Sequence, residues 1–273
     1  MVYRGLLDDG SVVAIKRRKH YLVPQFVNKV RWISEVRNKH LVKLIGYCEE
    51  NDEQILVYDY LHCRNVGNHL YDSEGGLPIG KLDMKQRIVI ALGAAKGLQH
   101  LHSLDPPLFH MHFRTRNVLL DENFVAKVSD FGVISLLLGD RGGSSSTIDY
   151  FRDPELRHSE ENFSERSDVY SFGVFLLELI SGREDENIVS QARESSVAKD
   201  FVDKMAERTM IDGAAEKMMG LALVCVGSGV ERPTMEKVVE QLERILEREI
   251  GPVLESRQSG EIGLVTLGSE LFK

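Results

Sequence analysis

The sequence H-M-H-F-R-T-R-N-V-L-L, residues His110 to Leu120, is followed at Asp130 by D-F-G and lies in the second of two parts of different character. Before it, residues 1 to about 60 contain short β-branched and aromatic runs, divided by turn signals such as Asp8-Asp9-Gly10. These runs indicate strands and a hairpin. From about residue 83 the pattern is helical almost throughout, beginning with the long amphipathic segment from Met84 to His102. We therefore expect a small sheet followed by a larger helical part.

Two further helices are indicated by their apolar residues. Between Pro24 and Asn38, the residues Phe26, Val30 and Ile33 recur at helical spacing, which predicts one helix among the strands. The segment from Ser167 to Ile180 is mostly apolar and predicts a buried helix. The fold class is therefore α+β.

Composition and charge exclude several classes of protein. The chain has 42% hydrophobic and 28% charged residues and a formal net charge of −8, so it is typical of a globular protein and not of a nucleic-acid binder. Cys48, Cys63 and Cys225 form no C-x-x-C motif, which favours a reducing compartment without structural zinc. No apolar run approaches the ~20 residues of a membrane helix. We expect a cytoplasmic protein without a transmembrane segment, or one held at the plasma membrane by a partner.

Several short motifs occur in a fixed order along the chain. They are V-A-I-K, L-V-K-L-I-G-Y-C, I-L-V-Y-D-Y-L, N-V-L-L, D-F-G, D-P-E, S-D-V-Y-S-F-G and E-R-P-T-M. From residue 2 to about 247 the chain resembles the eukaryotic protein kinase domain. Within it, the chain is similar to the plant receptor-like and receptor-like cytoplasmic serine/threonine kinases, relatives of the animal interleukin-receptor-associated kinases.

The resemblance implies a bilobal architecture over residues 1–250. A small antiparallel sheet lobe with one helix occupies residues 1–58, a hinge residues 59–64, and a larger, mainly helical lobe residues 65–250. Residues 251–273 form a weakly patterned tail. The glycine-rich loop of the family would precede Val2, so we expect a first lobe without it.

The resemblance also implies a nucleotide site with ATP and Mg²⁺ as cofactors. Lys16 matches the lysine that holds the α- and β-phosphates, and Asn117 and Asp130 match the two Mg²⁺ ligands, both oxygen donors. The plainer alternatives are a surface lysine at a strand end and a D-F-G turn without metal. The nucleotide-binding set is Val2, Ala14, Lys16, Tyr58, Asp59, Leu61 and Leu119. In it, Asp59 and Leu61 offer hinge backbone groups, Tyr58 guards the back of the pocket, and Ala14 and Leu119 cover the adenine.

The chain departs from the family pattern in the helix that follows V-A-I-K. Lys29 stands where the family has the glutamate that pairs with Lys16, and two like charges disfavour the closed arrangement of the helix. Glu35 lies six residues further on and faces the wrong side to replace that glutamate. We therefore expect ATP and Mg²⁺ to bind weakly or not at all.

The catalytic loop departs further. An active relative would read H-R-D-x-K-x-x-N, and here Met111, His112 and Arg114 replace Arg, Asp and Lys. Met111 cannot bind a phosphate, whereas Arg114 keeps the positive charge of lysine. The neutral imidazole of His112 can accept a proton, but it lacks the fixed negative charge that orients a substrate hydroxyl. His112 and Arg114 are thus the candidate catalytic residues in a degenerate loop.

The activation segment departs from the family pattern, whereas the residues that hold the fold together match it. Ile148 to Arg152 replace the T-x-G-Y-L of the family, which puts peptide docking in doubt, and residues 144–147 are either phosphorylation sites or a plain flexible loop. The pairs His100/His102 and His110/His112 are explained without a metal. In contrast, Glu155 with Arg232, and Asp168 below the catalytic loop, match structural residues of the family. So does an apolar column of Phe131, His110, Ile33 and Leu44.

Three functional hypotheses follow. The first is a pseudokinase of the plant receptor-like type, a signalling scaffold or allosteric partner for other protein kinases or receptor complexes. The second is an atypical ATP-dependent serine/threonine kinase that uses His112 and Arg114. The third is a nucleotide-sensing switch, in which Lys16, Asn117 and Asp130 bind Mg-ATP without transferring phosphate.

Overall fold

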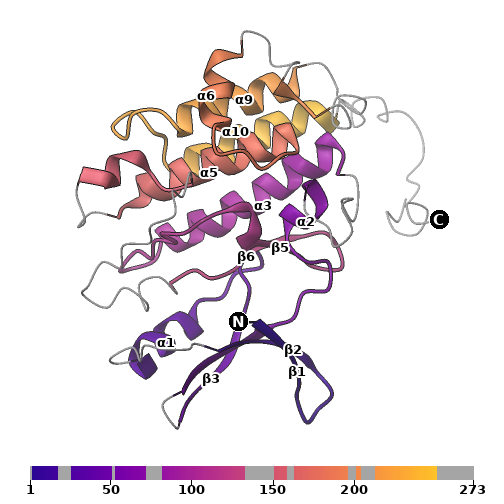
Figure 1. Ribbon diagram of the computed structural model, residues 1–273, viewed down its shortest axis with the longest axis vertical. Coiled ribbons are helices and arrows are strands. Elements are labelled where there is room, and N and C mark those ends of the chain that lie inside the picture. The colour runs from indigo at the N-terminus through magenta and orange to yellow at the C-terminus, as the bar shows by residue number, and fades with distance from the viewer. Residues whose placement is uncertain are drawn as a thin grey trace, which may run out of the picture.

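A computed structural model describes residues 2–17, 26–50, 53–71, 82–132, 151–158, 163–195, 201–203 and 213–250. Figure 1 shows two lobes: an antiparallel sheet with one helix at the N-terminal end, and a larger, mainly helical lobe that holds the remaining elements from α2 to α10. The predicted α+β class and bilobal arrangement are confirmed. The predicted tail, the candidate phosphorylation sites at 144–147 and the positions 148–150 lie outside the described residues.

The sheet has four antiparallel strands in the order β1-β2-β4-β3. They are β1 (Val2–Leu6), β2 (Val12–Arg17), β3 (Leu44–Glu50) and β4 (Glu53–Asp59). The predicted hairpin turn joins β1 to β2, where the Gly10 N–H donates to the Leu7 carbonyl at 2.9 Å. Gly10 has φ of 84°, a left-handed conformation that glycine adopts without strain. Burial alternates along β4, so one face of the sheet packs on the core.

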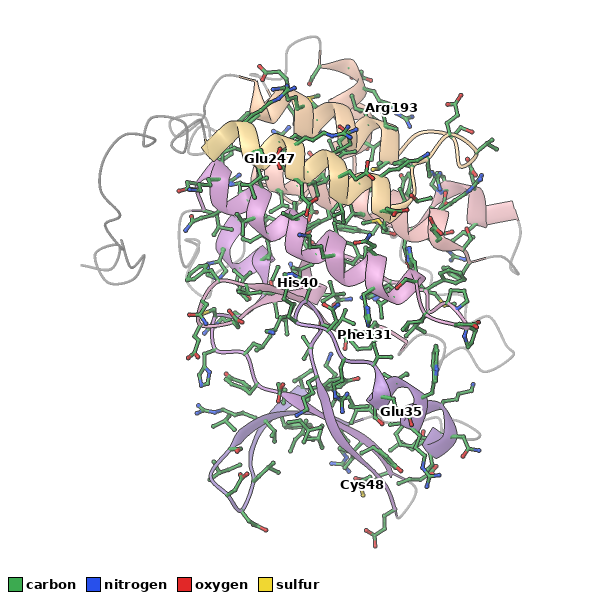
Figure 2. The ribbon with its side chains drawn as sticks, turned by 180° about the vertical axis from the view of Figure 1, so that it is seen from behind. Glu35, His40, Cys48, Phe131, Arg193 and Glu247 are labelled. Atoms are coloured by element: carbon green, nitrogen blue, oxygen red, sulfur yellow. The ribbon has the colours of Figure 1, made fainter. Side chains whose placement is uncertain are left out.

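The helix α1 (Phe26–Glu35) packs against β3. Phe26, Val30 and Ile33 are its buried residues, as the spacing predicts. The ring of Phe26 meets that of Tyr47 edge-on, with centroids 6.2 Å apart. Figure 2 shows Glu35 at this helix, beside the lobe junction where Phe131 lies.

The second lobe is built around two long helices. The helix α3 (Met84–His102) has the predicted bounds and starts with a capping box formed by Asp83 and Gln86. The helix α5 (Glu165–Ser181) is buried from Ser167 onward and ends at Gly182, whose φ is 66°. α5 packs against α3 and α9 (Ala214–Cys225), and α10 (Met235–Ile250) packs on α3. The remaining elements are α2 (Val66–Leu70), η1 (Thr115–Asn117), β5 (Val118–Leu120), β6 (Ala126–Val128), η2 (Pro154–His158) and α6 (Ile188–Glu194).

Backbone hydrogen bonds join the two lobes close to His40, which Figure 2 labels between the sheet and the helices. Val42 N–H donates to the Val128 carbonyl at 2.9 Å, and Val128 N–H donates to the His40 carbonyl at 2.8 Å. The same His40 carbonyl lies 2.8 Å from where a Cβ on Gly97 would be, so α3 needs glycine there. The connection between α1 and β3 is thereby fixed to β6 and α3. Of the helices that the structure describes, none is long and apolar enough to cross a bilayer.

Candidate functional site

The catalytic loop begins at His110 and is anchored from below by Asp168 of α5. The Asp168 carboxylate is buried and accepts the backbone N–H of His110 at 2.7 Å and of Met111 at 2.8 Å. His102 Nε2 lies 2.8 Å from the same carboxylate. These bonds hold Met111 at φ of 65°, a left-handed conformation that is uncommon for a residue with a side chain. Asp168 therefore has the anchoring position that its sequence context predicts.

His110 joins the catalytic loop to D-F-G. Its Nδ1 accepts the His112 N–H at 3.3 Å, so Nε2 carries the proton and donates to the Ser129 carbonyl at 2.8 Å. Complete burial lowers the pKa of this imidazole below its usual value, which keeps the ring neutral. Within the described ranges, no three His, Cys, Asp or Glu side chains are placed to hold a metal. His102 and His110 thus have structural partners in Asp168 and in the Ser129 carbonyl.

Asn117 closes the loop from the other end. Its side-chain Nδ2 donates to the His112 carbonyl at 2.9 Å, which turns the amide oxygen away from that bond. Its backbone carbonyl accepts Ser129 N–H at 2.8 Å and Ser129 Oγ at 3.1 Å. Asn117 thereby ties the loop to the residue just before D-F-G.

A set of polar contacts under this loop, made by Thr115, Tyr71 and Glu178, was missed in the sequence. The Thr115 hydroxyl donates to the Glu178 carboxylate of α5, and the Tyr71 hydroxyl donates to the same Oε2 at 3.0 Å. Glu178 is fully buried. A carboxylate inside the apolar run V-F-L-L-E-L-I was the available signal, because a buried charge requires hydrogen-bond donors.

Lys16 on β2 forms an ion pair with Asp130, the first residue of D-F-G. Asp130 adopts φ of 64°, again in the left-handed region. The Lys16 Nζ also lies 5.5 Å from the centroid of the Tyr58 ring. Burial, and then the charge of Asp130, raise the pKa of the Tyr58 hydroxyl, so Tyr58 stays neutral. Two residues that are far apart in the sequence thus meet at the lobe junction.

The sheet register aligns several predicted nucleotide residues. Val2 pairs with Lys16, and Ala14 pairs with Tyr58, so all four side chains share one face of the sheet. Asp59 ends β4 and Leu61 follows it, both partly buried. Leu119 comes from the helical lobe, on β5, and its backbone bridges to Asn65. We call the face with Val2, Ala14, Lys16 and Tyr58 the slot face.

The two substituted residues of the catalytic loop are placed differently. His112 is half-buried, with both of its backbone groups in the bonds described above. The Arg114 guanidinium lies over the ring of Phe151, 5.7 Å from its centroid. The Phe151 carbonyl in turn accepts the Ser171 hydroxyl of α5 at 2.7 Å. Arg114 therefore connects the catalytic loop with the segment that precedes D-P-E.

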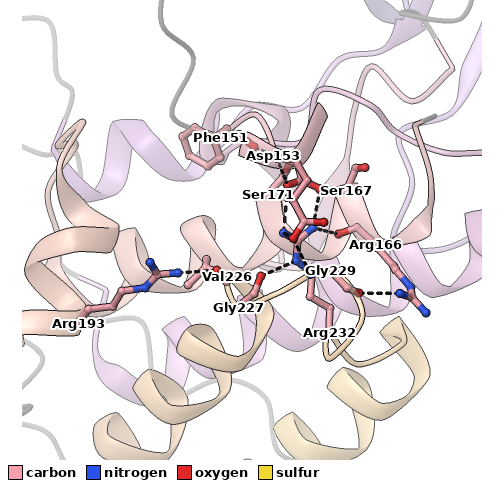
Figure 3. Close-up of polar contacts among 11 residues, drawn as sticks. Phe151, Asp153, Arg166, Ser167, Ser171, Arg193, Val226, Gly227, Gly229 and Arg232 are labelled. Atoms are coloured by element: carbon pink, nitrogen blue, oxygen red, sulfur yellow. Dashed lines mark hydrogen bonds and ion pairs between the residues drawn. The ribbon is translucent and has the colours of Figure 1, made fainter. Parts of the chain in front are cut away.

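Figure 3 shows the buried ion pair that holds this segment on the helical lobe. The Arg232 guanidinium contacts both carboxylate oxygens of Asp153, at 2.5 and 3.0 Å, and these side chains are 1% and 4% exposed. Glu155 lies 3.6 Å from Arg232 and is 56% exposed, and it also accepts the Gly229 N–H at 2.8 Å. The expected Glu155–Arg232 contact is present, but Asp153 is the closer partner. No local sequence pattern distinguishes the two carboxylates.

Comparisons with known proteins agree with this geometry. The family model for protein tyrosine and serine/threonine kinases matches residues 1–242. The chain belongs to the protein kinase family. A probable leucine-rich repeat receptor-like protein kinase of Arabidopsis thaliana is 38% identical over 90% of this kinase chain and 28% of its own length. The Arabidopsis receptor-like protein kinase THESEUS 1 is 36% identical, over 91% of the chain and 31% of its own length.

The solved structures include a close relative of special interest. The pseudokinase domain of BIR2, described as an immune regulator of the RLK/Pelle family, superposes with a TM-score of 0.78. It is 31% identical in sequence, and the match covers 91% of this chain and 79% of that one. The chain is thus a kinase domain of the receptor-like type. It spans about a third of the length of the curated relatives named above.

Protein kinases generally use ATP and Mg²⁺, and the oxygen atoms of Asp130 and Asn117 are suitable ligands for Mg²⁺. Asp130 and Asn117 offer a carboxylate oxygen and an amide oxygen, the hard donors that Mg²⁺ requires. Two protein ligands are enough for a Mg²⁺ ion that also binds nucleotide phosphates and keeps several waters. A site made of protein ligands alone would need more of them. Asp130 and Asn117 are therefore the residues that would hold the metal, where it would neutralise phosphate charge.

The kinase helix α1 does not supply the family's partner for Lys16. Lys29 lies partly buried on α1, and the one carboxylate of this helix, Glu35, is exposed. Lys16 is paired with Asp130 instead. The lysine that would contact phosphates and the aspartate that would bind metal therefore neutralise each other.

Proposed function

We propose that the chain is a pseudokinase of the plant receptor-like kinase type, which acts as a signalling scaffold or allosteric partner. In this proposal it transfers phosphate poorly or not at all. One observation carries the proposal: the hydrogen bonds that hold the catalytic loop are present, whereas the side chain expected to act as the catalytic base is not. Asp168, His110 and Asn117 hold the loop by hydrogen bonds, yet the position of the catalytic base carries an imidazole.

The position of Arg114 supports the loss of transfer. Stabilising a γ-phosphate requires a cation that points into the cleft. Arg114 stacks on Phe151, a contact that draws its guanidinium toward the adjoining segment. We infer that Arg114 has become a structural residue.

The nucleotide site is weak in this proposal. The slot face, with Asp59, Leu61 and Leu119 at its edges, holds the base, while Lys16, Asn117 and Asp130 hold the phosphates and Mg²⁺. Because Lys16 and Asp130 already form an ion pair, Mg-ATP must break this contact to bind. The lost ion pair lowers the net affinity.

An atypical serine/threonine kinase that uses His112 and Arg114 is the alternative. The hydrogen bonds that hold the catalytic loop favour it, because they fix both the N–H and the carbonyl of His112. A nucleotide-sensing switch is the third candidate, favoured by the direct Lys16–Asp130 contact, which Mg-ATP would separate.

The partners proposed are other protein kinases or receptor complexes, on the cytoplasmic side of the plasma membrane. The similarity to receptor-like kinases and to the pseudokinase domain of an immune regulator supports this placement. The proposal assigns no nucleic-acid role.

A phosphotransfer assay combined with a nucleotide titration tests the proposal. The purified chain is incubated with ATP and Mg²⁺ or Mn²⁺, and both phosphate incorporation and melting temperature are measured. We expect no incorporation above that of Asp130→Ala. Incorporation that Lys16→Ala abolishes would establish the atypical kinase, with Lys43→Ala on the exposed surface as the matched control. A metal-dependent rise in melting temperature without incorporation would establish the switch.

A further inference from the structure

Exposed basic side chains gather at the lobe junction around His40, which Figure 2 labels between the sheet and the helices. The connection between α1 and β3 carries Arg37, Lys39 and Lys43, and all three are exposed. Lys127 joins them from β6, because its Nζ donates a hydrogen bond to the Lys39 carbonyl at 2.7 Å. We call these four residues the junction patch: Arg37, Lys39, Lys43 and Lys127.

Hydrogen bonds hold both parts of the junction patch in place. The Val128 N–H donates to the His40 carbonyl at 2.8 Å, and His40 Nδ1 lies 3.1 Å from the Ala126 carbonyl. The residues on either side of Lys127 are therefore bound to the connection that carries Lys39. Because β6 belongs to the helical lobe and the connection leads into the sheet, the patch extends across both lobes.

Positive charge approaches His40 from three elements. Burial, and then the charges of Lys39, Lys96 and Lys127, lower the pKa of the His40 imidazole, so the ring stays neutral. Lys96 on α3 pairs with Glu243 at 2.7 Å, and we leave it out of the junction patch for that reason. The direction of the pKa shift agrees with the hydrogen bonds, which place Lys39 and Lys127 together.

Carboxylates offset little of the charge of the junction patch. Among the residues that the structure describes, the side chains of Lys39 and Lys43 form no hydrogen bond or ion pair. Asp121 lies 3.9 Å from Lys127, and its other oxygen accepts two N–H groups of its own turn. The exposed acids nearest in sequence pair with no described cation: Glu35 and Glu122. The patch therefore carries positive charge on a chain of formal net charge −8.

We propose that the junction patch binds the anionic lipid surface of a membrane. Clusters of roughly four to eight lysines and arginines are attracted to an anionic cytoplasmic leaflet. Lysines predominate in the patch, and their ammonium groups are compact, hydrated point charges that suit an array of lipid headgroups and lack the paired geometry of arginine. The choice of a lipid surface rests on the proposed function, which places the chain at the cytoplasmic side of the plasma membrane.

Sedimentation of the full chain with lipid vesicles tests the proposal. One set of vesicles contains phosphatidylcholine alone, and the other also contains phosphatidylserine. We expect the chain to sediment with the anionic vesicles and not with the neutral ones. Added salt should release it, because the attraction is between exposed charges.

Charge reversal within the patch gives the sharpest comparison. Lys39→Glu combined with Lys43→Glu should weaken binding to the anionic vesicles by on the order of tenfold or more. The matched control is Lys85→Glu combined with Lys217→Glu, because both lysines are exposed and the net charge changes equally. Lys217 is on α9, and Lys85 lies about 12 Å along α3 from Gly93, the residue of that helix beside His40.

Melting temperatures check that each variant folds, which we expect because the substituted lysines are exposed. If charge reversal disturbs folding, the neutral pair Lys39→Gln and Lys43→Gln replaces it and should still bind more weakly than the control. Equal loss of binding in the patch and control variants would overturn the proposal, since the attraction would then be non-specific. Equal binding to neutral vesicles would overturn it too. Binding of a polyglutamate peptide, without binding of anionic vesicles, would show an acidic protein partner instead.

Failure of this inference and failure of the proposed function give different results. Phosphate transfer by the chain would overturn the pseudokinase assignment and leave vesicle binding by the junction patch intact. Absence of vesicle binding would overturn the lipid surface alone, whatever the transfer assay shows.

Discussion

The ammonium group of Lys16 is paired with the carboxylate of Asp130, and this ion pair joins the sheet lobe to D-F-G. Both side chains are about a quarter exposed, at 28% and 25%, so solvent screens part of the attraction. A double-mutant cycle with Lys16→Met and Asp130→Asn should give a coupling energy of about 1 kcal/mol in urea unfolding. The same cycle on the more exposed Arg116–Glu184 pair should give less than about 0.5 kcal/mol. A coupling energy of zero would show that Lys16 and Asp130 do not neutralise each other.

The buried contact between Arg232 and Asp153 should dominate the stability of the adjoining segment. Asp153→Asn leaves a buried guanidinium without its bidentate partner and should lower the free energy of unfolding by roughly 3–5 kcal/mol. Glu155→Gln changes a mostly exposed side chain and should cost less than about 1 kcal/mol. Urea denaturation of the two variants measures the difference. A larger loss for Glu155→Gln would show that Glu155 is the principal partner after all.

Two helical glycines should respond in opposite ways to alanine. Gly97→Ala places a Cβ 2.8 Å from the His40 carbonyl at the lobe junction and should destabilise the fold by about 1–3 kcal/mol. Among the residues that the structure describes, a Cβ added at Gly220 on α9 would meet no atom within 4 Å outside the backbone of its own helix, so Gly220→Ala should stabilise the chain by up to about 1 kcal/mol. Thermal and urea unfolding of both variants provide the comparison. If Gly97→Ala left the free energy of unfolding unchanged, the lobe junction would have room for a Cβ that its backbone contacts do not indicate.

The buried neutral His110 should make stability fall in mild acid. Burial depresses its folded pKa below the unfolded value of 6.5, so below that pH the unfolded chain binds a proton that the folded chain does not. Stability from this residue is present above pH 6.5 and is lost as pH falls toward the folded pKa, by up to about 1.4 kcal/mol per pH unit. The free energy of unfolding, measured with urea between pH 7.5 and 5.5, should fall less steeply with decreasing pH in His110→Gln than in the original chain. An unchanged slope would assign the effect to other groups, His40 among them.

Local patterns in the sequence predicted most elements of the fold. The bounds of α3 and the buried face of α1 follow from apolar spacing, which neighbouring residues determine. The anchoring role of Asp168 followed from its place in a motif. The contacts of Arg114 with Phe151 and of Arg232 with Asp153 did not follow, because they join segments whose approach depends on the packed lobe.

The most direct test of the account restores the family residues in the loop. The variant with His112→Asp and Arg114→Lys regains a carboxylate base and a lysine on a loop whose hydrogen-bonded frame is intact. Phosphate transfer from ATP is measured for the original chain, for this double variant, and for the double variant with Asp130→Ala. We expect no transfer by the original chain and a gain of roughly 100-fold over background in the double variant, lost again with Asp130→Ala. Transfer by the original chain that His112→Ala abolishes would contradict it.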